Sequence, residues 1–385
     1  MKVIYFGAIH SSDSDFPLLK EYSRKGIDWL AYVPLTKYVH KAGLFNIEKL
    51  IPKSGLFKAS AFSEMEPYAD YIDLDKIIII NDYNTHQRLF SSRILWLKVF
   101  LHMIKQHADI FHACWPLSGH ATILFHLPCK KVLTVHDPIS HSNQQNAKSE
   151  KVRVKSFKSF DKLVLLSKPL LNDFFSHYNI SKEKVIVNKM GEFDYLREIK
   201  QIPSNVAPKY ILFFGYISPY KGLEYLCEAM NEVHKRYPDV KLVIAGGGNI
   251  YFNWEPFQNK DYIILRNHFI DLPELSGLLH DCEFSVCPYK DATQSGVVQT
   301  AFSMNVPMVV TNVGALPEVV KNDQNGLVVP PCNSKALAEA IIDLLANPQF
   351  VSAMRDNIKN VWQKQMAWEP IAQKYIKCYQ SLLQS

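Results

Sequence analysis

The stretch SVCPYKDATQSGVVQTAFS, residues 285–303, contains the end of an apolar strand, a polar loop and the start of an apolar helix. We predict a buried strand at Phe284–Val286 and a helix at Val297–Met304. Small and polar residues, Ala292 to Gly296, lie between the two. Main-chain N–H groups and the helix dipole can receive a diphosphate at such a strand–loop–helix junction. The stretch therefore indicates an α/β fold with an anion site at the end of a strand.

The same alternation of short β-branched runs and longer helical segments extends outward through the whole chain, which is typical of a mainly parallel sheet. Predicted strands in the first half are Lys2–Phe6, Trp29–Tyr32, Ile77–Ile80, Ile110–Ala113, Lys131–Val135, Lys162–Leu166 and Lys184–Asn188. Predicted strands in the second half are Tyr210–Phe214, Lys241–Ala245, Tyr262–Leu265, Phe284–Val286, Met308–Thr311 and Gly326–Val328.

The length of 385 residues predicts two domains, because a single hydrophobic core stops growing below that size. A Pro- and Ser-containing segment of low apolar content, residues 199–209, is predicted to be the linker. We assign residues 1–198 to the first doubly wound, Rossmann-like domain and 210–350 to the second. Two such domains are expected to face each other across a cleft. The tail from Val351 is helical in pattern, with Pro370 predicted to kink it.

Composition excludes several classes of protein. Hydrophobic residues make up 48% and charged residues 21%, which is ordinary globular composition rather than disorder. Met1–Phe6 is too short for a signal peptide, and Ile77–Ile80 is too short to span a bilayer, so we expect a cytoplasmic protein. The seven cysteines contain no C-x-x-C pair, which argues against a disulfide framework or a zinc site.

The net charge of +6 is unevenly distributed. Residues 1–200 hold 28 Lys and Arg against 20 Asp and Glu, whereas the remainder of the chain is slightly acidic. Basic residues gather between Lys148 and Lys168. Such a patch can bind nucleic acid, phosphates or an anionic membrane, although a solvated helix face is the favoured interpretation. The segment Ser91–His107 can touch a membrane surface as well, but we favour a helix packed on the sheet.

A second motif, FFGYISPYKGLE at residues 213–224, again joins a strand to a helix. The strand ends at Gly215, and the helix is predicted to begin near Gly222. We expect free N–H groups at this helix start, together with Lys221, to receive phosphate oxygens.

These blocks, with LVIAGGG at 242–248 and NGLVVPP at 325–331, make the chain similar to the retaining glycosyltransferases of family four, which have the GT-B fold. The resemblance covers roughly residues 205–350. The first half matches more loosely, through the opening strand with Gly7, Trp115-Pro116 and Thr134-Val135-His136-Asp137. In this family the acceptor domain comes first and the last helix crosses back onto it, so the resemblance assigns residues 351–385 to that crossing.

The resemblance also implies a donor site, with departures from the family pattern. The family uses two glutamates separated by seven residues, whereas Asp291 and Gln299 occupy these positions here. The first is expected to contact the donor sugar and the second the ribose. The usual Arg before the phosphate lysine is replaced by Tyr216, which leaves Lys221, and Lys290 is a candidate to compensate. The donor-binding residues implied are Gly215, Tyr216, Lys221, Gln294, Ser295, Gly296, Val297 and Gln299.

On the acceptor side the resemblance implicates His136, which follows a predicted strand, as strand-end groups in active sites do. A capping or core histidine is the alternative. Gly7, Trp115 and the first-loop residue His10 complete the acceptor-side set. Lys221, Asp291 and His136 are the candidate catalytic residues. No metal and no cofactor are expected. The sequence has no D-x-D motif flanked by predicted strands that would bind a metal ion together with the nucleotide, and the GT-B resemblance implies metal independence.

The sequence therefore predicts transfer of a hexose-type sugar from a nucleoside diphosphate, with retention, to a saccharide or lipid-linked saccharide. Contact with an anionic membrane at its cytoplasmic face is an expected additional partner. Nucleic acid is not, because no recognition helix or aromatic-interleaved motif accompanies the basic residues. The alternatives are a non-catalytic nucleotide-sugar-binding subunit and another GT-B enzyme such as an epimerase.

Overall fold

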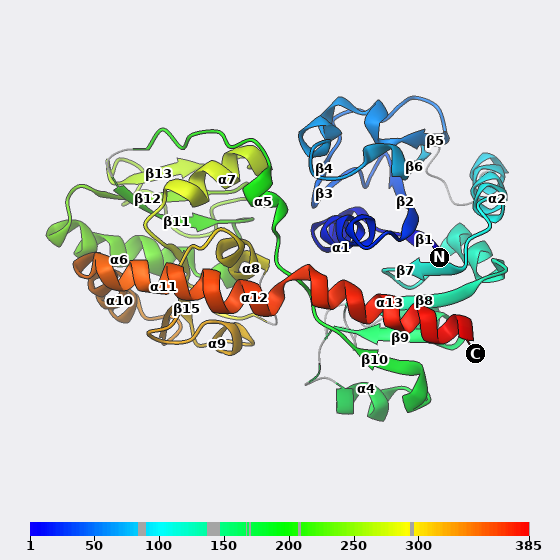
Figure 1. Cartoon of the computed structure of the whole chain (residues 1–385). Coiled ribbons are helices and arrows are strands. Elements are labelled where there is room, and N and C mark those ends of the chain that lie inside the picture. Colours follow the sequence, from blue (N-terminus) through cyan, green and yellow to red (C-terminus); the bar gives the residue numbers. More distant parts are fainter. Residues whose placement is uncertain are drawn as a thin grey trace. The chain divides into compact units, whose positions relative to one another are not determined.

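The computed structural model describes residues 1–83, 90–136, 147–166, 168, 171–206, 209–292 and 296–384. The chain divides into two compact units, the first formed by Met1–Gly191 with Met366–Ser385 and the second by Glu192–Gln365. Each unit is built around its own sheet (Figure 1).

The first unit contains an eight-stranded sheet in the order β10-β9-β8-β7-β1-β2-β6-β5. All neighbouring strands are parallel except β5, which pairs antiparallel with β6 at one edge. The strands are β1 (Lys2–Phe6), β2 (Asp28–Thr36), β5 (Gly55–Lys58), β6 (Ile77–Asp82), β7 (Ile110–Ala113), β8 (Lys130–Val135), β9 (Lys162–Leu165) and β10 (Val185–Val187), with a small hairpin of β3 (Lys41–Ala42) and β4 (Phe45–Asn46) outside the sheet.

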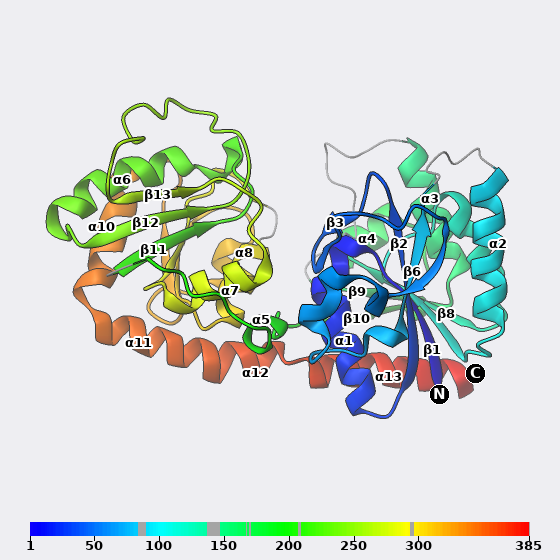
Figure 2. The same cartoon turned by 90° about the horizontal axis from the view of Figure 1, so that it is seen from above.

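Helices cover both faces of this sheet (Figure 2). One apolar core joins the strands to α2 (Phe90–Ile104), the 3-10 helix η5 (Gly119–His126), α3 (Ala147–Ser159) and α4 (Leu171–His177). On the opposite face α1 (Ser12–Arg24) contacts the last helix, α13 (Trp368–Gln384). The strand order reverses between β1 and β7, and ligands of doubly wound sheets bind at such a reversal.

The second unit has a six-stranded, fully parallel sheet in the order β13-β12-β11-β14-β15-β16, so its reversal falls between β11 and β14. Its strands are β11 (Lys209–Phe214), β12 (Val240–Ala245), β13 (Ile263–Arg266), β14 (Ser285–Cys287), β15 (Met308–Thr311) and β16 (Gly326–Val329). Its helices are α5 (Tyr195–Glu198), α6 (Leu223–Arg236), α7 (Leu272–Asp281), α8 (Gly296–Ser303), α9 (Leu316–Val319), α10 (Ser334–Ala346), α11 (Pro348–Asn357), a π-helical turn (Ile358–Trp362) and α12 (Gln363–Met366).

The division between the units differs from the predicted boundaries of 198 and 351. Leu196 is buried and accepts a hydrogen bond from Ser276 Oγ at 2.8 Å, so the segment after Gly191 already packs on the second unit. Val351 and Met354 lie in the second core, so α11 also belongs there and the return to the first unit begins at Met366. The predicted 199–209 linker is likewise part of the second unit.

Pro370 does not kink the terminal helix, contrary to the prediction. The break between α12 and α13 falls at Ala367, and Pro370 lies in the first turn of α13. Proline is tolerated there because the first N–H groups of a helix have no intrahelical acceptor.

Candidate functional site

The first candidate site lies in the second unit, where β11 and β14 end side by side. Leu212 of β11 pairs with Ser285 of β14, so the segments that follow both strands leave the same edge of the sheet. Gly215 and Tyr216 follow β11, and Asp291 follows β14. The two motifs identified in the sequence therefore meet at the strand-order reversal of this sheet.

Lys221 is the central side chain of this site. The residue is only 6% exposed, and its ammonium lies against Gly215, where an added Cβ atom would approach Lys221 Nζ to 2.8 Å. The same Cβ position is 3.6 Å from Val297 Cγ2 at the start of α8. The structure therefore brings Gly215, Lys221 and Val297 together, and glycine at 215 leaves room for the ammonium.

The Lys221 ammonium forms no hydrogen bond or ion pair with any residue in the described part of the chain. Its surroundings are aromatic, with Nζ 5.2 Å from the ring centre of Tyr289 and 5.9 Å from that of Tyr220. Burial lowers the pKa of Lys221, because desolvation disfavours the charged form. A buried cation of this kind favours the binding of an anion.

Gly222 positions the lysine. Its φ of +64° is left-handed, and a Cβ atom there would lie 2.1 Å from the carbonyl oxygen of Pro288. Lys290 N–H donates to the carbonyl of Tyr220 at 2.7 Å, which further fixes the two loops together. The lysine turn and the segment after β14 therefore form one packed unit.

Two expectations about this region are wrong. The first N–H group of α6, at Leu223, is not available to a phosphate, because it donates to Tyr251 Oη at 2.9 Å. Lys290 does not supply a second unpaired cation, because its Nζ forms an ion pair with Glu224 Oε1 at 2.8 Å. Tyr251 Oη also donates to Glu224, so this cluster is satisfied internally.

The remaining donor-side candidates are placed as follows. Gly296 begins α8, and a Cβ atom added there would have no atom within 4 Å. Asp291 is exposed and Gln299 half-buried, and Tyr216 is 67% exposed. Gln294 and Ser295 lie outside the described residues.

The second candidate site lies in the first unit, where β1 and β7 end together at Phe6 and Ala113. The His10 ring contacts that of Trp115 edge-on at 4.6 Å, and Trp115 stacks on His136 at 5.1 Å. Trp115 Nε1 is buried without a hydrogen-bond partner among the described residues. Residues that the sequence places on three separate loops are therefore brought together, whereas Asp137 lies outside the described residues.

Asp15 is a buried residue of this site that was not among the predicted site residues. It accepts hydrogen bonds from Tyr5 Oη at 2.6 Å and Ser11 Oγ at 2.8 Å, and it packs against Gly7, where a Cβ would lie 2.9 Å from Asp15 Oδ2. Burial raises the pKa of Asp15 to about 7, although these hydrogen bonds lower it. A small cavity is lined by Asp15, His136 and residues of α13. The signal available in the sequence was an Asp eight residues after a strand-ending glycine.

A buried hydrogen-bond chain joins α13 to the sheet beneath this site. His112 Nε2 lies 2.8 Å from Thr134 Oγ1, and His112 Nδ1 lies 2.5 Å from Tyr379 Oη, which in turn contacts Tyr22 Oη at 2.6 Å. Burial, with a smaller effect of His136, lowers the pKa of His112 to about 3, so the ring is neutral. The terminal helix is thereby an integral part of the first unit.

Within the described ranges no three His, Cys, Asp or Glu side chains gather in a way that could hold a metal ion. Metal independence stays a prediction. Among the same residues, no helix is long and apolar enough to cross a bilayer.

Comparison with known proteins matches residues 208–347 to the family model "Glycosyl transferases group 1". An uncharacterised glycosyltransferase of Methanocaldococcus jannaschii is 27% identical over 234 residues, which cover 56% of this chain and 59% of that protein. The chain thus matches about six-tenths of the length of this relative. Sucrose-phosphate synthase from Thermosynechococcus elongatus has a TM-score of 0.67 at 16% identity, covering 99% of both chains. Anabaena HepE in complex with UDP-glucose has a TM-score of 0.66 at 16% identity, covering 99% of this chain and 100% of HepE.

The fold is therefore GT-B, with two Rossmann-like domains. The segment that carries the Lys221 site is the one similar to the group 1 glycosyltransferases.

Proposed function

We propose that this protein is a glycosyltransferase that moves a hexose-type sugar from a nucleoside diphosphate, with retention, to a saccharide or lipid-linked saccharide. Cell-surface polysaccharide or glycoconjugate synthesis at the cytoplasmic face of a membrane is the setting that we infer. The observation that carries the proposal is the buried, unpaired ammonium of Lys221 beside Gly215 and α8.

A diphosphate fits the chemistry of this site. Burying an ammonium without a counter-ion is costly, and an anionic ligand removes that cost by pairing with it. The N-terminus of α8, which begins beside Lys221, adds N–H groups and a favourable dipole. When the glycosidic bond to the diphosphate breaks, negative charge develops on the leaving oxygens, and a preorganised cation stabilises it.

The sugar-nucleotide donor is inferred from two further facts. Residues 208–347 match a glycosyltransferase family model, and HepE, which shares the fold, was solved with UDP-glucose. We assign Lys221 and the amides around Ser295–Val297 to the diphosphate, Asp291 to the donor sugar and Gln299 to the ribose. No metal ion is assigned a role.

The first unit is assigned to the acceptor. His10, Trp115 and His136 form one aromatic cluster at a strand-order reversal, where groups that contact ligands gather in such sheets. Trp115 Nε1 offers a buried donor that a saccharide hydroxyl would satisfy. His136 is the residue that we assign to the reacting sugar.

A non-catalytic nucleotide-sugar-binding subunit is the second candidate. It is favoured by one observation: Lys290, the candidate to replace the charge of the arginine missing at Tyr216, is paired with Glu224. Fold alone does not distinguish a binding subunit from an enzyme.

Thermal-shift measurements test the proposal. UDP, GDP, ADP, dTDP and CMP are each added with and without magnesium to the wild type, to Lys221→Met and to a control, Lys235→Met. Lys235 is an exposed lysine on α6 that pairs only with Glu232. We expect one nucleotide to stabilise the wild type and the control without metal, by about 2.7 kcal/mol at a hundredfold excess over Kd, but not Lys221→Met. Stabilisation of all three proteins alike would remove Lys221 from the site.

Turnover distinguishes the two candidates. The nucleotide that binds is supplied as its sugar conjugate, and slow release of free sugar without an acceptor supports the enzyme. Tight binding with no hydrolysis and no transfer to any saccharide supports the binding subunit.

A further inference from the structure

Helix α2 presents an apolar stripe to solvent. Phe90, Ile94, Leu97 and Leu101 are 75%, 39%, 48% and 48% exposed, respectively. Their spacing of four, three and four residues places them along one side of the helix, over a length of roughly 16 Å at 1.5 Å per residue. The stripe is therefore continuous rather than a set of scattered residues.

The inner side of the same helix is already occupied by the core. Leu95, Val99 and Met103 are at most 3% exposed and pack against the sheet. A helix that only covers a sheet needs one apolar face, and its outer face is ordinarily polar. The prediction that this segment packs on the sheet is thus correct for one face and leaves the other unexplained. Contiguous exposed apolar surface of this kind marks an interaction site.

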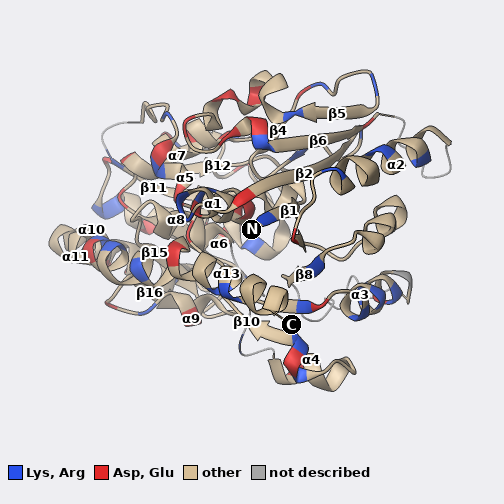
Figure 3. Cartoon of the chain, turned by 45° about the vertical axis from the view of Figure 1, so that its right-hand side comes forward, with Lys and Arg blue, Asp and Glu red and all other residues tan. Residues whose placement is uncertain are grey.

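Exposed cations flank the stripe on both sides. At 100° per residue, Lys98 lies to one side of the stripe and Arg93 to the other, Lys105 directly follows the helix, and all three are exposed. Helix α2 itself carries no Asp or Glu. The nearest acid at its start is Asp82, which accepts a hydrogen bond from Ser92 on the inner side. Figure 3 shows the basic positions along α2 and α3.

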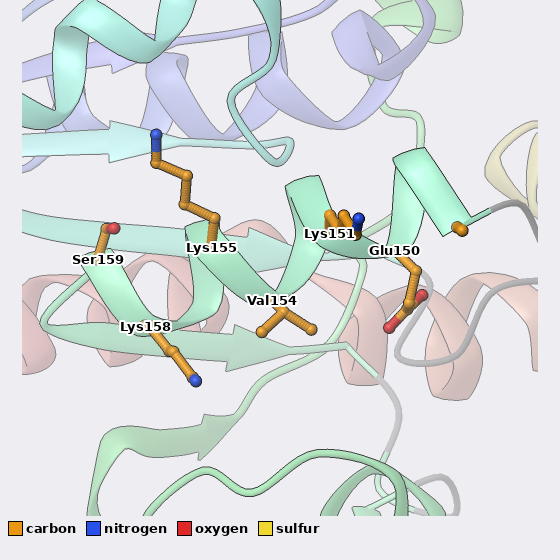
Figure 4. Close-up of a pocket in the computed structure, with 7 residues that line it drawn as sticks. Glu150, Lys151, Val154, Lys155, Lys158 and Ser159 are labelled. Carbon is orange, nitrogen blue, oxygen red and sulfur yellow. The ribbon is translucent and has the colours of Figure 1, made fainter.

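Helix α3 extends the basic surface but does not form its centre. Lys151, Lys155 and Lys158 are exposed, and Lys155 Nζ lies 5.3 Å from the ring centre of Phe125 in η5, which contacts α2. In Figure 4 the side chains of Lys155 and Lys158 leave α3 in opposite directions, so the lysines of α3 do not form a single face. The favoured interpretation of this patch as a solvated helix fits α3, whereas α2 combines charge with apolar surface.

We propose that the outer face of α2 docks onto the surface of an anionic lipid bilayer. The helix would lie parallel to the membrane, with Phe90, Ile94, Leu97 and Leu101 inserted at the level of the lipid headgroups and Arg93, Lys98 and Lys105 contacting anionic headgroups. An apolar stripe bordered by cations is the arrangement that interfacial helices use. A protein partner would need only the apolar stripe, whereas a membrane also accounts for cations on both borders and for the absence of acidic residues.

Vesicle flotation tests this surface. The full chain is mixed with vesicles of phosphatidylcholine alone, or with 30% phosphatidylglycerol added, at roughly 0.05 M and 0.5 M salt, and no donor or acceptor is present. Three variants are compared: Leu97→Ser/Leu101→Ser, Lys98→Glu/Lys105→Glu, and the control Val361→Ser, which changes an exposed apolar residue of the other unit. Circular dichroism melting confirms that each variant is folded.

We expect the wild type and Val361→Ser to float only with anionic vesicles and less at high salt, because salt screens the headgroup attraction. Both double variants should bind at least tenfold more weakly. Absence of wild-type binding, or equal binding by the Leu97→Ser/Leu101→Ser variant, would overturn the proposal. So would concentration-dependent self-association through the stripe without vesicle binding. Because the assay contains no sugar nucleotide, a negative result leaves the proposed glycosyl transfer untouched.

Discussion

Replacing Lys221 by Met should raise the stability of the ligand-free protein while it weakens nucleotide binding. Methionine keeps most of the length of the side chain and removes the charge. Lys221 is 6% exposed, and no described acid pairs with it, so its ammonium is a net cost to folding. A polar group buried without compensation costs roughly 1–3 kcal/mol in protein mutational data. We expect a gain in unfolding free energy of that order.

The effect of pH has a definite sign. Because burial lowers the pKa of Lys221, the unfolded chain binds more protons than the folded one between that lowered value and the ordinary value of 10.5. Wild-type stability should therefore rise with pH in this alkaline window, and the rise should be smaller in Lys221→Met. Below the window the variant keeps its full advantage.

Scanning calorimetry of the ligand-free proteins measures this effect, at about 2–4 °C of Tm per kcal/mol for a cooperative unit of the size of Glu192–Gln365. In parallel, turnover should fall on the order of 10²- to 10³-fold, as it does when one donor to a developing oxyanion is removed. A lysine whose role is structural would give the opposite thermal result. A lower Tm for Lys221→Met, with nucleotide binding unchanged, would refute the reasoning.

Three further predictions concern other parts of the chain. Asp15→Asn should flatten the dependence of the unfolding free energy on pH between about 4 and 7. Because the pKa of Asp15 is raised in the folded state, the unfolding free energy of the wild type should fall as pH rises through this window, by up to about 4 kcal/mol. Urea titrations of both proteins at several pH values would measure this difference. Tyr379→Phe should lower the unfolding free energy by roughly 1–3 kcal/mol, because His112 and Tyr22 lose a buried partner, and equal Cm values for the two proteins would contradict this. Gly222→Ala should impair both stability and nucleotide binding, since its Cβ would collide with Pro288 O at a left-handed φ; an unchanged Tm and an unchanged nucleotide shift in the same thermal-shift assay would contradict this.

Most of the fold could be predicted from the sequence, because apolar runs mark buried parallel strands directly. The strands Lys2–Phe6, Ile110–Ala113 and Met308–Thr311 were predicted with the observed bounds. The edge strand β5 was not predicted, because its mixed burial gives no such run. The unit boundaries were misplaced for another reason: Leu196 and Met354 are ordinary apolar residues, and nothing local tells which core they enter.

The sites were predicted unevenly. The structure places the predicted residues Gly215 and Lys221 together, and likewise His10, Trp115 and His136, because the carboxyl ends of parallel strands meet at one edge of a sheet; their roles stay predictions. The ion pair of Lys290 with Glu224 was missed because the partners are far apart in sequence. Asp15 was missed because its importance comes from burial, which a sequence position after a loop does not reveal.

The return of α13 to the first unit affects how the chain is made. Met1–Gly191 leaves the ribosome before the second unit, but its buried His112 and Tyr22 find their partner, Tyr379, only when α13 emerges. At 5–20 residues per second the intervening second unit takes on the order of 10 to 30 s to synthesise. During that interval the second unit can fold completely, whereas the first carries an uncovered face over α1 and β8. The first unit is thus completed after the second, and its α1 and β8 face needs protection from aggregation until α13 has been synthesised.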